Sequence, residues 1–208
     1  MIRNAARFAQ RFPKTRVNLR VHVSQDTSSD FSEACRELNK VFAQYPNVVP
    51  YPGFIVDYTN CCEKMNNRQI SDFFYRLHQE NVYHAPFYPS LAMGGCCATT
   101  LNAYVVDAKG LLYKCWVDID KPERAIGNLA DMKIGNSALL ASYLVGYSMY
   151  DDPRCQKCFF LPICDGGCAY RRRANSEGKN MELCTTMKND LDRNLETHYE
   201  MKLKKETL

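Results

Sequence analysis

The chain has 208 residues, of which 46% are hydrophobic and 24% are charged, a composition that is ordinary for a folded globular protein and excludes a mainly disordered chain. Its formal net charge of +4 is too mild and too evenly spread to indicate binding to nucleic acid or to a membrane surface. No run reaches the roughly 18 apolar residues that a membrane helix needs, and no secretory signal opens the sequence. We therefore expect a cytoplasmic protein with no nucleic-acid partner and no membrane partner.

The first half of the chain alternates predicted helices and strands. Apolar periodicity places helix, strand, helix, strand and helix, in that order, at residues 4–12, 16–23, 31–45, 48–58 and 67–77. Asp30 and Glu33 have capping-box spacing for the second helix, and Asn67 is the expected cap of the third. The arginine-rich, acid-free opening also has the composition of a mitochondrial presequence, an alternative to a short amphipathic helix.

This alternation indicates βαβ crossovers and parallel strands. Two strands are too few to close a barrel, so we expect an open α/β layer or a piece cut from a larger barrel. Pro, Gly and Cys become frequent near residue 90, which predicts two domains, 1–90 and 91–208. The second contains a predicted hairpin around Gly110, a helix capped by Asn136 and a closing helix from Thr185 to about Lys204.

Eleven cysteines are the most unusual feature of the sequence, at about three times the average for this length. The number is odd, and a chain of this size can bury a core without disulfides. A reducing compartment and metal ligation therefore fit better than disulfides.

The cysteine spacing points to thiolate ligation of metal. The run CQKCFFLPICDGGC supplies Cys155, Cys158, Cys164 and Cys168, while Cys96, Cys97 and Cys115 precede it and Cys184 follows it. Zinc is one interpretation, because Cx2C pairs are its usual ligands and a single zinc site needs only four thiolates. Two 4Fe-4S clusters need eight thiolates in two sets of four. Without Cys97 these cysteines supply only seven.

The missing thiol would be Cys97, or the more distant Cys61 or Cys62, unless one iron stays open. Gly166 and Gly167 favour iron-sulfur over zinc, because bare glycines let backbone N–H groups approach cluster sulfides. The spacing therefore favours iron-sulfur clusters over zinc, and either metal over disulfides.

The spacing Cx13Gx4C, gap, Cx2Cx5Cx3C, gap, C resembles the SPASM domain, the auxiliary cluster-binding extension of radical S-adenosylmethionine (SAM) enzymes. The local sequences are similar too: GLLYKCW around Cys115, IGNL at residues 126–129 and LPICDGGCAYRRR around Cys164 and Cys168. The resemblance covers residues 96 to about 200 and is closest to enzymes that modify ribosomally made peptides. It implies a peptide or protein substrate.

The resemblance also implies a ligand set for each of two 4Fe-4S clusters. The outer cluster would be held by Cys155, Cys158, Cys164 and Cys184. The inner cluster would be held by Cys96, Cys115 and Cys168, with Cys97 as the adjacent candidate for a fourth ligand.

Residues 1–82 resemble the last portion of a radical SAM partial barrel. In such barrels polar residues at strand ends line the cofactor, so Arg20 and His22 are candidate SAM contacts, and a solvated strand edge is the alternative. The CxxxCxxC motif that holds the SAM cluster in this family is absent from the chain. We therefore expect SAM binding and cleavage only together with the missing barrel portion, a candidate partner.

The expected function is thus that of the C-terminal part of a radical SAM/SPASM peptide maturase, inactive alone and present as a fragment, a truncated gene model or one half of a split enzyme. The alternatives are a zinc-binding interaction module and a standalone iron-sulfur scaffold. Trp116 stands where sulfatase-maturing relatives have a catalytic aspartate, which favours other peptide cross-linking. Asp118 and Asp120, the nearest acids, are expected in surface turns, with the role of base as the alternative. Arg171–Arg173 is expected as a solvated run, with cluster charge compensation or leader-peptide binding as its alternative roles.

Overall fold

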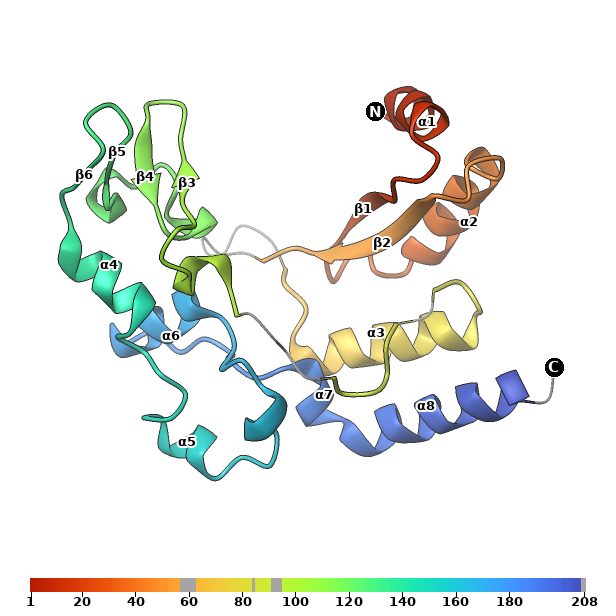
Figure 1. Ribbon diagram of the computed structural model, residues 1–208. Helices are drawn as coiled ribbons and strands as arrows, with labels where there is room; N and C mark the ends of the chain where they lie inside the picture. The colour runs from red at the N-terminus through yellow and green to blue at the C-terminus, as the bar shows by residue number, and fades with distance from the viewer. Residues whose placement is uncertain (57–62, 84, 91–94, 207–208) are drawn as a thin grey trace. The chain divides into compact units, whose positions relative to one another are not determined.

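A computed structural model describes residues 1–56, 63–83, 85–90 and 95–206 of the chain. The chain divides into two compact units, one of Met1–Tyr88 with Asn189–Leu208 and one of Pro89–Lys188 (Figure 1). The division lies close to the predicted boundary at residue 90. The tail from Asn189, however, groups with the first unit instead of the second.

The protein is mixed α/β, with two small sheets and no closed barrel among the described residues. None of the helices in these ranges combines the length and apolar character that a membrane crossing requires.

The first unit has the predicted order of helix, strand, helix, strand and helix. Its elements are α1 (Ile2–Arg11), β1 (Val17–Val23), α2 (Phe31–Val41), β2 (Val48–Phe54), α3 (Asn67–Gln79) and, from the tail, α8 (Leu191–Glu206). The strands β1 and β2 pair in parallel, from Val17 opposite Val48 to Val23 opposite Phe54. The crossover through α2 makes this a βαβ unit, as the alternation predicts.

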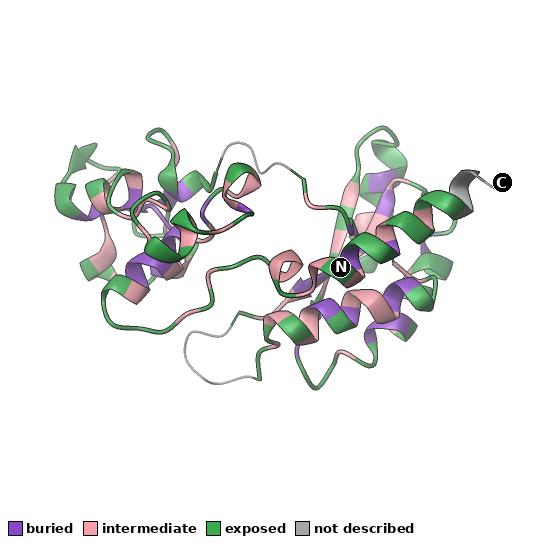
Figure 2. Ribbon diagram, turned by 90° about the horizontal axis from the view of Figure 1, so that it is seen from below, coloured by how far each residue is buried: buried purple, intermediate pink, exposed green. Residues whose placement is uncertain are grey.

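The core of the first unit consists of two apolar clusters (Figure 2). In the larger, Phe73 of α3 meets the edges of Phe31 and Phe54 at ring-centroid distances of 5.3 and 5.4 Å. Cys35 is buried in the same cluster, and burial raises the pKa of its thiol to about 11. Cys35 therefore behaves as a small apolar residue in this core.

Two helix starts differ from the prediction. Asp30 precedes α2 but makes no side-chain cap, because its own backbone is already helical. In α3 the cap is Asn66 instead of Asn67: its side chain accepts from the Gln69 N–H, and the Gln69 side chain accepts from the Asn66 N–H. The capping box thus forms at α3 and not at α2.

The predicted closing helix is broken into α7 (Thr186–Asn189) and α8. At the break, Asp190 accepts a hydrogen bond from Ser71 Oγ of α3 over 2.9 Å. Arg193 of α8 pairs with Asp72 at 2.8 Å and donates to Ser71 Oγ at 3.0 Å. These contacts fasten α8 to α3, which explains why the tail belongs to the first unit.

The second unit contains a four-stranded antiparallel sheet in the order β3-β4-β5-β6 and several short helices. The elements are β3 (Val105–Val106), β4 (Leu111–Tyr113), β5 (Gly127–Asn128), β6 (Lys133–Ile134), α4 (Ser137–Leu144), α5 (Pro153–Gln156) and α6 (Ala169–Ser176). The predicted hairpin is β3–β4, turning at Gly110 with φ +81°. Asn136 caps α4 as predicted, its side chain accepting from the Leu139 N–H.

Candidate metal centre

The cysteines predicted as metal ligands all lie in the second unit and carry free thiols. The distant candidates Cys61 and Cys62 fall outside the described residues. Within the described ranges, no group of three or more His, Cys, Asp or Glu side chains is gathered closely enough to hold a metal ion. Electrostatic interactions nevertheless link Cys96, Cys115 and Cys168, and shared cations link Cys155, Cys158 and Cys184.

The three inner cysteines share one local geometry. Cys96, Cys115 and Cys168 each stand in extended backbone directly before a helical turn, formed by Cys97–Thr99, Trp116–Asp118 and α6 respectively. Such positions leave the first N–H groups of the turn free for nearby acceptors. The β3–β4 hairpin positions Cys115, whereas Gly166 and Gly167 position Cys168.

Charge interactions connect the inner thiols to one another. Burial, with smaller contributions from the charges of Asp118, Cys168 and Cys96, raises the pKa of Cys115 to about 11, while a backbone hydrogen bond from Val117 acts in the opposite direction. The pKa of Cys96 is raised by burial and then by Cys97 and Cys168. A bound cation would relieve thiols that disfavour one another's ionisation.

Lys114 is a buried cation beside the inner thiols that the sequence reasoning missed. It is 1% exposed, and its ammonium donates to the carbonyl oxygens of Thr100 at 2.5 Å and Ala103 at 2.6 Å. Burial lowers the pKa of Lys114, and the charges of Cys97 and Cys96 act in the opposite direction. Lysines are usually exposed, so the residue type gave no sign that Lys114 is buried. Only its position next to Cys115, a predicted ligand, could have indicated that it lies near the thiols.

Two cations, Arg154 and Lys188, lie near three of the four outer thiols. Lys188 Nζ donates to Cys184 Sγ over 3.8 Å. Burial lowers the pKa of Lys188, but a hydrogen bond with Cys158 and the charge of Cys184 outweigh it and leave the pKa raised. Arg154, held mainly by Asp152, also lies within range of the charges of Cys155 and Cys184. Shared cations thus connect Cys155, Cys158 and Cys184.

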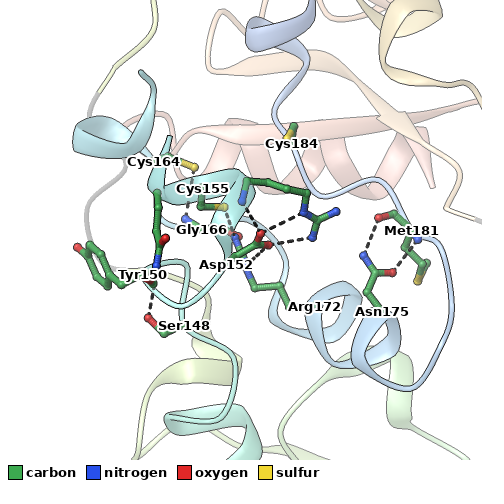
Figure 3. Close-up of polar contacts among 12 residues, drawn as sticks. Ser148, Tyr150, Asp152, Cys155, Cys164, Gly166, Arg172, Asn175, Met181 and Cys184 are labelled. Carbon is green, nitrogen blue, oxygen red and sulfur yellow. Dashed lines mark hydrogen bonds and ion pairs between the residues drawn. The ribbon is translucent and has the colours of Figure 1, made fainter. Parts of the chain in front are cut away.

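The two glycines before Cys168 adopt the backbone that their sequence position suggested. Gly166 and Gly167 have φ of +85° and +77°, a region that disfavours side chains. The N–H of Gly166 donates to Cys164 Sγ over 3.4 Å, as drawn in Figure 3. A Cβ on Gly167 would come within 2.5 Å of the Leu183 carbonyl oxygen, one residue before Cys184. The pair therefore allows close approach to Cys164 and to the Cys184 segment.

Asp118 and Arg173 contradict two expectations from the sequence. Asp118 is buried, 1% exposed, and pairs with Arg173 at 3.1 Å instead of facing solvent in a turn. In the run 171–173, Arg172 and Arg173 are buried as well, so this is not a solvated stretch. The cause is that α6 points these two side chains at acidic and aromatic partners, a grouping that no local pattern indicates. Asp120, by contrast, is exposed in a turn with φ +65°, as expected.

Arg20 and His22 lie on the exposed face of β1 in the first unit. Arg20 extends across β2, where a Cβ on Gly53 would collide with its guanidinium Nε, and it donates to the Phe54 carbonyl oxygen over 3.5 Å. The missing side chain at Gly53 thus makes room for Arg20. Contact of either residue with SAM stays a prediction.

No protein-family model and no curated protein matches the chain. The likeness to SPASM domains therefore rests on the cysteine spacing and on the sequences around Cys115, Cys164 and Cys168. Both 4Fe-4S clusters and zinc accept sets of four thiolates, so the donor atoms fit either group. The N–H donor at Cys164 and the cations near Cys184 suit thiolate ligands of either group, because both four-thiolate sites carry net negative charge.

Proposed function

We propose that the chain is the C-terminal, auxiliary-cluster portion of a radical SAM/SPASM enzyme that modifies ribosomally made peptides or proteins. The observation that carries this proposal is the sorting of the thiols. Six of the seven assigned cysteines share electrostatic neighbours with members of their own implied set: Cys96, Cys115 and Cys168 for the inner one, and Cys155, Cys158 and Cys184 for the outer one. A zinc-binding module with two sites would use the same groups of thiols, so the metal content distinguishes the two functions.

In this proposal the inner 4Fe-4S cluster is held by Cys96, Cys115 and Cys168. Cys97 is the proposed fourth ligand, because it follows Cys96 directly and its charge acts on both Cys96 and Lys114. Lys114 then offsets part of the negative charge of the thiolates. The inner set is supported by the burial of Cys115 and Lys114.

The outer 4Fe-4S cluster is held by Cys155, Cys158, Cys164 and Cys184 in the same proposal. Arg154 is a cationic neighbour of Cys155 and Cys184, and Lys188 is one of Cys158 and Cys184. The fourth, Cys164, accepts the Gly166 N–H. A cation that faces a thiolate stabilises its ionised form, which is the form that binds iron.

The clusters would supply an acceptor for one electron from a substrate radical, or an open iron for a substrate thiol. The protein supplies the thiolates, the N–H donors and the cations that set the environment of these groups. The SAM cluster would be held by a portion with the CxxxCxxC motif, in the same polypeptide or in another. Arg20 and His22 are proposed to contact SAM only together with that portion.

Metal analysis of the anaerobically purified chain tests this function. We expect brown protein with broad absorption near ~400 nm and about eight iron and eight sulfide per chain, the content of two cubane clusters. Colourless protein with about two zinc ions that unfolds with chelator would instead identify the zinc module. Cys35→Ala is the matched control, since Cys35 is buried in the other unit and should not change the metal content.

A further inference from the structure

Arg172 is the one residue of the arginine run 171–173 whose guanidinium contacts a proposed cluster ligand within the described structure. It lies on α6, and its side chain is 8% exposed. The guanidinium donates to the Gly166 carbonyl oxygen, to Asp152 Oδ2 at 3.3 Å and to Cys155 Sγ at 3.1 Å, and the last two contacts appear in Figure 3. The contact with Cys155 is as short as an ordinary hydrogen bond to oxygen.

The same residue also joins segments that carry three of the proposed ligands. Its backbone N–H donates to the Cys168 carbonyl oxygen over 3.0 Å, in the first turn of α6. The Gly166 carbonyl, which its side chain holds, belongs to the loop between Cys164 and Cys168. Arg172 is therefore fixed relative to the ligand loop before its guanidinium reaches Cys155.

The charge of Arg172 is only partly balanced. Its acidic partner Asp152 is shared with Arg154, whose guanidinium lies 2.8 Å from the same carboxylate oxygen. The hydrogen bond from Arg154, and then the charge of Arg172, hold the pKa of Asp152 well below its usual range. One carboxylate thus faces two guanidiniums, which leaves a net positive charge beside Cys155.

The neighbouring arginines have different surroundings. Arg173 is paired with Asp118 and Glu177. Arg171 donates to the Glu182 carbonyl oxygen over 2.8 Å. Because these three residues are consecutive, Arg171 offers a matched control with the same side chain, the same helix and no contact to a proposed ligand.

A charged N–H donor on a ligand sulfur favours the more electron-rich state of an iron-sulfur cluster. Hydrogen bonds to the sulfurs and net charge are among the main factors that set cluster potentials. Charge-assisted hydrogen bonds are also roughly twice as strong as neutral ones, and their effect is larger in a water-poor site. Reduction adds one electron from an external reductant and breaks no bond.

We propose that Arg172 is a positioning residue that raises the reduction potential of the outer cluster by donating a charge-assisted hydrogen bond to Cys155 Sγ. This inference rests on the proposed function, because it requires an outer cluster. It adds a residue and a role that the ligand pattern does not contain.

The test is an anaerobic reductive titration with dithionite of the full chain, carrying its clusters, followed by electron paramagnetic resonance. In Arg172→Gln we expect about a tenfold fall in the equilibrium constant for one-electron reduction of one cluster, equivalent to about 59 mV. The other cluster and the Arg171→Gln control should keep the wild-type potentials. Unchanged potentials in Arg172→Gln, with full iron content, would overturn the inference.

Arg172→Lys provides a second variant if the glutamine variant loses iron. Lysine keeps the charge but lacks the fork that reaches Gly166, Asp152 and Cys155 together, so we expect a smaller fall in the same constant. Loss of iron in both variants would make Arg172 a purely structural residue and overturn the inference. Wild-type protein without iron would overturn the proposed function itself, a result that metal analysis separates from the others.

Discussion

Asp118 and Arg173 form an ion pair of 3.1 Å in which the side chains are only 1% and 3% exposed. Asp118 ends the turn that follows Cys115, and Arg173 lies on the helix that begins after Cys168. The Tyr143 hydroxyl donates to the other carboxylate oxygen of Asp118 over 2.5 Å. The pair therefore fixes two of the proposed inner ligands relative to each other.

Arg173→Gln should destabilise the second unit strongly. Removing one partner of a buried ion pair leaves an uncompensated charge, at a cost of about 3–5 kcal/mol. The guanidinium also lies against the rings of Tyr143 and Tyr170, at 5.3 and 5.2 Å from their centroids. Urea unfolding of Arg173→Gln and Arg171→Gln measures the difference, and equal midpoints in the two variants would show that the pair is not a major source of stability.

Gly167→Ala should impair the outer site by displacing the segment before Cys184. Gly167 and Gly178 both have positive φ, but only at Gly167 would a new Cβ meet backbone, the Leu183 carbonyl oxygen at 2.5 Å. Gly178→Ala is thus a control for the φ penalty alone, roughly 1–2 kcal/mol. We expect Gly167→Ala to lose more stability than Gly178→Ala, together with about half of the bound iron, the share of one of two clusters. Identical unfolding and iron content in the two variants would contradict a steric clash with Leu183.

Protonation of Glu177 should lower the free energy of unfolding of the protein in acid. A bidentate hydrogen bond from Arg124, at 3.0 and 3.2 Å, is the largest cause that lowers the pKa of Glu177 from 4.5, and Arg173 adds to it. Because the folded pKa is depressed, this stability is present above pH 4.5 and is lost as pH falls through the folded value.

The free energy of unfolding in urea at about pH 7 and about pH 3.5 tests this linkage. Glu177→Gln should lose less stability between the two pH values than the wild type. Glu182→Gln, at an exposed position, should behave as the wild type does. A Glu177→Gln variant with the full wild-type pH dependence would remove Glu177 as a cause.

Much of the fold was predictable because its signals are local. Alternating apolar residues indicated β1, and helical spacing indicated α1 and α3 close to their observed bounds. The candidate ligands were predictable for the same reason, because they are recognised by the spacing of cysteines along the sequence. The burial of Asp118, Arg172 and Arg173 was not, because it depends on partners up to 55 residues away in sequence. Lys114 was missed for a related reason, since its acceptors are carbonyl groups that any residue could offer.

The most direct test of the central claim is the iron and sulfide content of the wild type beside Cys115→Ser and Cys164→Ser, one variant for each proposed ligand set. We expect about eight iron and eight sulfide in the wild type and about four of each in either variant, with the two variants differing in their electron paramagnetic resonance spectra. Zinc in place of iron, or loss of all iron in both variants, would contradict two separately held clusters.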